Sequence, residues 1–97
     1  MKNNYAYAAE MISMILIGEK HMRCEYATIT ADYIQGLRFP ELVRDNRGNQ
    51  LIPGDQYMIV TCDNSYKYYV NVSGDSVVTA CAELLNFIQY ALFFLQL

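Results

Sequence analysis

Residues 57–76 read YMIVTCDNSYKYYVNVSGDS, and this stretch decides the fold. Two runs rich in β-branched and aromatic residues, 57–62 and 66–72, are separated by Asp-Asn-Ser at 63–65. Such residues tolerate the tight or left-handed backbone of a hairpin turn. The stretch therefore predicts an antiparallel β-hairpin.

The second strand of this hairpin has two different faces, because successive side chains of a strand point to opposite sides. One face carries Tyr66, Tyr68, Val70 and Val72. The other carries Lys67, Tyr69 and Asn71. We expect the first face to be the core face, so that Lys67 and Tyr69 lie on the exposed outer face.

A long helix is expected after the hairpin. Gly74 gives the backbone the freedom to turn, and Asp75 can accept hydrogen bonds from the first free amides of a helix that runs from Ser76 to near the C-terminus. Helical spacing predicts a buried stripe made of Val77, Cys81, Leu84, Leu85, Ile88, Ala91, Leu92 and Leu95. The opposite side carries Thr79, Glu83, Asn86 and Tyr90, and the same spacing continues it to Phe93 and Leu97.

The last two turns of this helix, residues 91–97, are thus apolar nearly all round. Three explanations remain open: burial under a long loop of the same domain, contact with a second copy or a partner, and insertion in a membrane surface. Burial under a loop is ordinary in small domains. The membrane is least favoured, because interfacial helices usually carry Lys and Arg on the polar face and this helix has none.

The rest of the chain supplies a second helix and a less regular middle. Residues 3–18 form a predicted helix, in which Tyr7, Met11, Met14, Ile15 and Gly18 follow helical spacing. Residues 22–35 are predicted as a strand, although 30–35 could instead open a helical turn. Residues 42–52 are predicted as a loose hairpin or a long loop, and 53–55 as a turn.

The order helix, strand, irregular middle, hairpin, helix predicts one α+β domain, a two-layer sandwich. An antiparallel sheet of about three strands would be covered by an N-terminal and a long C-terminal helix. This order resembles the double-stranded-RNA-binding domain in topology. The basic cluster that such a domain presents at the start of its last helix is replaced here by Asp-Ser-Val-Val-Thr-Ala at 75–80, so the resemblance does not carry the function.

Composition and charge exclude or disfavour several classes of function. The chain has 97 residues, of which 54% are hydrophobic and 18% charged, a balance that excludes disorder. The net charge of −3 argues against direct binding of nucleic acid, because the densest basic region, 38–47, is interrupted by Glu41 and Asp45. Three widely spaced cysteines and the absence of a signal-peptide pattern lead us to expect a cytoplasmic protein that is not attached to a membrane.

Catalytic and metal-binding chemistry find little support in the sequence. His21, Cys24, Cys62 and Cys81 could supply the donors of a structural zinc site, but only His21 and Cys24 have the close spacing that such sites use. Buried cysteines of a hydrophobic core explain the three thiols more simply. We therefore expect no catalytic, metal or cofactor residues, and no enzymatic activity.

The stretch 68–76, YYVNVSGDS, followed by an apolar helix, resembles small accessory proteins carried by conjugative and other mobile elements of gut bacteria. The resemblance covers the C-terminal third and implies an accessory or regulatory role. Some such acidic proteins inhibit host defence machinery by occupying a nucleic-acid groove.

We therefore expect a small protein–protein interaction module whose partner is another protein or a second copy, a homodimer formed through the C-terminal helix. The candidate interface residues are Lys67, Tyr69, Tyr90, Phe93, Phe94 and Leu97. The alternative is a binder of nucleic acid or a small ligand that uses tyrosines on the sheet face for stacking.

Overall fold

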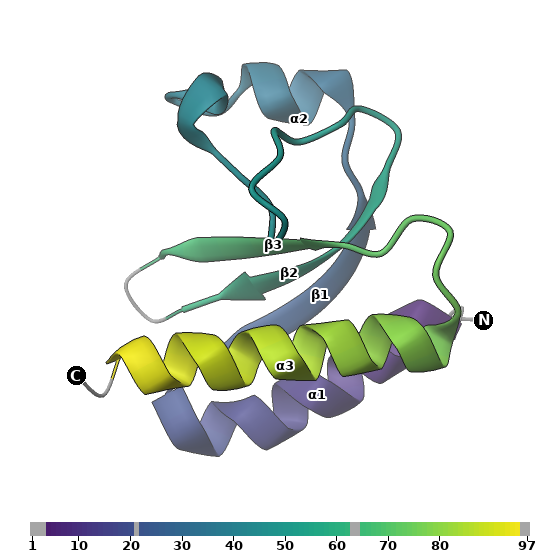
Figure 1. Cartoon of the computed structure of the whole chain (residues 1–97), viewed down its shortest axis with the longest axis vertical. Coiled ribbons are helices and arrows are strands. Elements are labelled where there is room, and N and C mark those ends of the chain that lie inside the picture. Colours follow the sequence, from purple (N-terminus) through teal and green to yellow (C-terminus); the bar gives the residue numbers. More distant parts are fainter. Residues whose placement is uncertain (1–3, 21, 63–64, 96–97) are drawn as a thin grey trace.

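The computed structural model confirms the α+β architecture (Figure 1). It describes the backbone of residues 4–20, 22–62 and 65–95, and the side chains of residues 4–14, 22–62 and 65–89. The elements are α1 (Asn4–Lys20), β1 (Arg23–Thr28), α2 (Ala31–Gln35), the 3-10 turn η1 (Pro40–Leu42), β2 (Gln56–Thr61), β3 (Lys67–Asn71) and α3 (Val77–Leu95).

The sheet is antiparallel, with the strand order β1-β2-β3. β2 and β3 form the predicted hairpin, in which Met58 lies opposite Val70. On its other side β2 pairs with β1, where Val60 lies opposite Cys24. Because β2 is the central strand, both of its faces can be covered, and the side chains from Tyr57 to Val60 are all buried.

Helices α1 and α3 lie side by side on one face of the sheet (Figure 1). The core between the helices and this face is made of apolar side chains from the two helices and from the sheet with its flanking residues: Ala9, Ile12, Met22, Cys24, Met58, Val60, Val70, Val72, Ala80, Leu84 and Ile88. Val70 and Val72 therefore lie on the predicted core face, and Tyr68 packs against the same cluster. Tyr66 differs from expectation, because it precedes β3 and is exposed.

The opposite face of the sheet is covered by the segment 29–55, which connects β1 to β2 and includes α2 (Figure 1). A second buried cluster fills the space beneath it: Ile29, Leu51, Tyr57, Ile59 and Tyr69. Within this segment Arg44 pairs with Gln50 in the loose hairpin that the sequence predicts, and residues 53 and 54 form the expected turn. We call residues 29–55 the cover segment.

The prediction of a continuous strand over 22–35 is wrong in its second half. β1 ends at Thr28, and α2 begins at Ala31. Thr30 has extended backbone, and its Oγ1 accepts a hydrogen bond from the Tyr33 N–H at 3.1 Å, which caps the helix. Thr30, a favoured helix-capping residue, was thus the sequence signal for the alternative prediction, a helical turn over 30–35.

The helix after the hairpin begins one residue later than predicted, and its cap is Ser76 rather than Asp75. The Ser76 Oγ accepts from the Thr79 N–H at 3.2 Å, whereas one carboxylate oxygen of Asp75 is buried without a hydrogen-bond partner among the described residues. Gly74 adopts a φ of 79°, the left-handed conformation that the predicted turn requires.

The two long helices differ from their predicted extent and orientation. α1 continues to Lys20, beyond the predicted end near Gly18. In α3 the fully buried stripe runs through Ala80, Leu84 and Ile88, and Leu85, predicted as buried, is 45% exposed. Among the described residues, no helix has the length and apolar character that a membrane crossing demands.

Candidate interaction surfaces

Of the two interface residues predicted on the hairpin, only Lys67 is exposed. Its ammonium lies 4.0 Å from a carboxylate oxygen of Glu25, and both side chains face solvent. Tyr69 is 4% exposed, so its placement on an open outer face is wrong. The cover segment buries it, because apolar side chains of this segment pack against this face of the sheet.

Three tyrosines meet under the cover segment. The hydroxyls of Tyr69 and Tyr33 are hydrogen-bonded at 2.7 Å, and the ring of Tyr57 meets that of Tyr69 edge to face. Burial, together with the Tyr33 hydrogen bond, raises the pKa of Tyr69. The Tyr57 hydroxyl accepts from the Ile52 N–H at 2.9 Å, and burial raises its pKa as well. The rings of Tyr57 and Tyr69 are therefore part of the core.

Three of the four remaining predicted interface residues belong to the last turns of α3. Tyr90, Phe93 and Phe94 belong to the helix, but their side chains are outside the described residues, as is Leu97. The structure therefore leaves their role as a prediction.

An exposed apolar stripe lies instead on α1. Tyr7, Met11 and Met14 are 61%, 53% and 76% exposed. Their spacing of four and three residues places them on one side of the helix, directly opposite the buried Ala9 and Ile12. We call these three residues the α1 stripe. Helical spacing had revealed the positions, but it could not tell which side of a mostly apolar helix would face the sheet.

The neighbouring helix contributes to the same layer. Val78 and Leu85 are exposed on α3, seven residues apart and thus on one side of it. Glu83 points to a different side, where its carboxylate accepts two hydrogen bonds from the Arg47 guanidinium at 2.9 and 3.2 Å. In the described side chains of the two helices, Glu10 and Glu83 are the charged residues.

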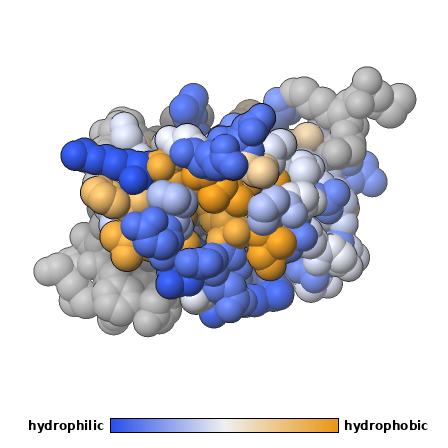
Figure 2. Space-filling model, turned by 90° about the horizontal axis from the view of Figure 1, so that it is seen from above, coloured by the Kyte–Doolittle hydropathy of each residue, from blue (hydrophilic) through white to orange (hydrophobic). Residues whose placement is uncertain are grey.

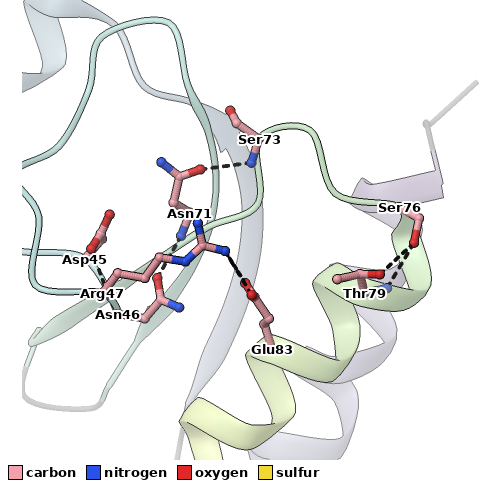
Figure 3. A network of polar contacts seen from close by, with 8 residues as sticks. All are labelled: Asp45, Asn46, Arg47, Asn71, Ser73, Ser76, Thr79 and Glu83. Atoms are coloured by element: carbon pink, nitrogen blue, oxygen red, sulfur yellow. Dashed lines mark hydrogen bonds and ion pairs between the residues drawn. The ribbon is translucent and has the colours of Figure 1, made fainter.

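The ion pair of Arg47 and Glu83 belongs to a polar network that ties the cover segment to the rest of the molecule (Figure 3). Asn46 Oδ1 accepts from the Asn71 N–H of β3 at 3.2 Å. The carboxylate of Asp45 accepts from the N–H groups of Arg47 and Asn49 at 2.8 and 3.0 Å, which fixes the turn between them. These hydrogen bonds and the ion pair therefore hold residues 45–49 of the cover segment in place, in a region whose conformation the sequence pattern did not define.

A second exposed apolar area lies where the cover segment leaves η1 beside the start of β3. Phe39, Leu42 and Tyr66 are exposed there, around a groove of about 620 Å³. Figure 2 looks onto the end of the molecule that carries α2 and shows apolar side chains between hydrophilic ones. No local sequence pattern predicts this groove, because its residues come from two segments that only the fold brings together.

The thiols behave as core groups. Cys24 is buried, and burial, with lesser contributions from Cys81 and Glu25, raises its pKa to about 12. Burial also raises the pKa of Cys62. Within the described part of the chain, no three His, Cys, Asp or Glu side chains are grouped so as to hold a metal ion, and His21 lies outside that part.

Comparison with known proteins does not extend this description: no family model, curated protein or solved structure matches the chain.

Proposed function

We propose that this protein is a small protein–protein interaction module that associates with a second copy of itself through the layer formed by α1 and α3. The observation that supports the proposal is the α1 stripe, three large apolar side chains in a row that face solvent. Contiguous exposed apolar patches, unlike single apolar residues on a surface, often mark interaction sites.

A second copy fits this surface better than a membrane does. An isologous interface brings each residue near the same residues of the other copy, so like charges would meet and repel. The described side chains of the layer carry little charge, and Glu83 is already paired with Arg47. Anionic lipids attract basic residues, which this part of the layer lacks.

The expected dimer is weak. α1 has 17 residues and is therefore about 25 Å long. Two such helices about 10 Å apart present a face on the order of 500 Å², below the roughly 800 Å² that each partner contributes to a standard interface. The dimer should therefore dissociate on dilution.

In this proposal the protein acts as an accessory or regulatory factor in the cytoplasm rather than as an enzyme. The resemblance of residues 68–76 to proteins of mobile elements supports such a role. Self-association would present two copies of any further binding surface at a fixed distance, which increases avidity for a partner with two matching sites.

The test is light scattering over a range of concentrations. The variant carrying Met11→Lys and Met14→Lys puts four cations into the proposed interface of the dimer, so we expect its dissociation constant to rise tenfold or more, in the manner of other like-charge contacts. Ile52→Lys, an exposed apolar position of the cover segment, serves as the control and should leave the dimer intact. A wild-type chain that stays monomeric at every concentration would refute the proposal.

A further inference from the structure

The groove beside β3 is basic in an acidic protein. Arg38, Arg44 and Lys67 line it, and none of the described residues that line it is acidic. The chain has seven basic and ten acidic residues, and three of the seven basic ones lie in this groove. Positive charge is thus concentrated at one place on a negative molecule, which favours a negatively charged ligand at that place. We call this feature the β3 groove.

The β3 groove is also apolar. Phe39, Leu42 and Tyr66 are 52%, 70% and 62% exposed. The guanidinium of Arg38 lies 5.6 Å from the centre of the Phe39 ring, so the cation and the aromatic ring form one surface. A ligand that fits must therefore offer both negative charge and at least one large apolar group.

The backbone of β3 offers hydrogen bonds on the same side. The Val72 N–H donates to the Gln56 carbonyl, and the Cys62 N–H donates to the Tyr66 carbonyl, both at 2.8 Å. Even-numbered residues of this stretch thus turn their backbone groups toward β2. In an antiparallel pair the intervening residues turn theirs away, so odd-numbered residues direct their N–H and carbonyl groups to the outer edge.

Part of this edge is already occupied. The Asn46 N–H donates to the Tyr69 carbonyl at 2.8 Å, and Asp45 forms a parallel bridge with Tyr69, so residues 45–46 act as a short additional strand. Toward the start of β3, no partner for the N–H or the carbonyl of Lys67 is found among the described residues. The groove lies at this uncovered part of the edge. Exposed strand edges bind extended peptides by adding a strand to the sheet.

We propose that the β3 groove binds a short, extended, acidic segment of another protein. Its main chain pairs with β3 at Lys67, its carboxylates lie against Arg38 and Arg44, and one large apolar side chain lies on Leu42 and Phe39. The exposed pair of Lys67 and Glu25 is long and contributes little, so an incoming carboxylate can replace it. This proposal concerns a different surface from the α1 stripe and does not depend on self-association.

A peptide fits the surroundings better than a nucleic acid strand. A phosphate backbone carries charge along its whole length, and beyond the groove it would meet a protein in which ten acidic residues outnumber seven basic ones. A peptide carries its charge only where the groove needs it. Aliphatic residues such as Leu42 favour apolar side chains, whereas bases stack on aromatic rings.

The experiment selects binders from a displayed library of random short peptides, using the full chain as bait. We expect the enriched peptides to be acidic with a large apolar residue. One such peptide is then synthesised and titrated in calorimetry, with single-stranded oligothymidylate as a second probe. Amide shifts in NMR spectra should appear at Lys67 on addition of the peptide.

Four variants locate the site. Arg44→Glu and Leu42→Ser should each weaken the peptide roughly tenfold, as loss of an interface anchor does. The matched controls Arg23→Glu and Ile52→Ser, exposed residues outside the groove, should leave the affinity within about twofold, the usual scatter of surface changes. Melting curves confirm that each variant is folded. The Met11→Lys, Met14→Lys variant should still bind, which separates this site from the dimer interface.

Three outcomes would overturn the proposal: no acidic enrichment in the library, an affinity that Arg44→Glu does not change, or tighter binding of oligothymidylate to the same groove. The last would identify a nucleic-acid site instead.

Discussion

At the scale of single residues, burial decides what the tyrosines and cysteines can do. Tyr69 and Tyr57 lie in the core, where a hydrogen bond to each neutral hydroxyl offsets the cost of removing it from water. Cys24 is likewise held as a protonated thiol. These tyrosines and this cysteine, which could have served as ligand-binding or reactive groups, are thus part of the core. The two candidate interaction surfaces consist mainly of exposed Met, Phe, Leu, Tyr and basic side chains.

Because its hydroxyl is buried, Tyr69 should make the folded protein less stable at high pH. Burial raises its pKa above the ordinary value of 10.0, so the unfolded chain ionises first and the folded chain resists ionisation. The contribution is therefore fully present below pH 10 and is lost as the pH rises beyond it. In Tyr69→Phe we expect a smaller decrease of stability above pH 10, and about 1 kcal/mol less stability at neutral pH because Tyr33 loses its partner.

Urea denaturation of both proteins at neutral pH and above pH 10 measures this difference. Tyr57 and Cys24 change in the same direction, so some pH dependence remains in the variant. A pH dependence that is identical in the two proteins would contradict the assignment to Tyr69.

At the scale of the elements, the ends of helices depend on individual hydrogen bonds. Thr30 caps α2, and Ser76 caps α3. Asp75 and Ser76 are adjacent and both are favoured cap residues, so the sequence could not separate them. The structure does so because the Asp75 carbonyl accepts a hydrogen bond from the Tyr5 hydroxyl, which fixes this residue against α1.

Ser76→Ala should therefore destabilise the protein by about 1 kcal/mol, the usual effect of losing a helix cap. Asp75→Ala should destabilise it less, because one oxygen of that carboxylate has no hydrogen-bond partner among the described residues. Thermal or chemical denaturation of the two variants gives the comparison. A larger effect of Asp75→Ala would show that Asp75 is the cap after all.

At the scale of the whole molecule, the sheet is covered on both faces. The helices cover one, and the cover segment, held by Asn46 and Arg47, covers the other (Figures 1 and 3). The same segment forms one wall of the β3 groove. The residues that hold the cover segment in place therefore stabilise both the core and the proposed binding site.

If the cover segment is part of the core, its buried and exposed leucines must differ in their effects. Leu51 is 8% exposed and Leu42 is 70% exposed. We expect Leu51→Ala to lower the free energy of unfolding by about 2 to 4 kcal/mol, as buried leucines do, and Leu42→Ala to change it by less than about 0.5 kcal/mol. If chemical denaturation shows an equally small effect for both variants, Leu51 is not part of the folded core.

The sequence alone determined the hairpin, the two long helices and the turn between them. The hairpin follows from β-branched runs around a turn, the two long helices from their spacing, and the turn at Gly74 from the left-handed backbone that glycine allows. These patterns are local, so neighbouring residues suffice to specify them. They were enough to predict the α+β order and the core residues Val70 and Val72.

Only the tertiary structure decided which surfaces remain open. The cover segment has no regular period, so its position over Tyr69 could not be inferred from its own residues. α1 is apolar on several sides. Packing against the sheet buries the side that carries Ala9 and Ile12 and leaves the α1 stripe exposed to solvent. The β3 groove joins residues far apart in the chain. Burial depends on contacts between distant segments, and a local pattern does not contain them.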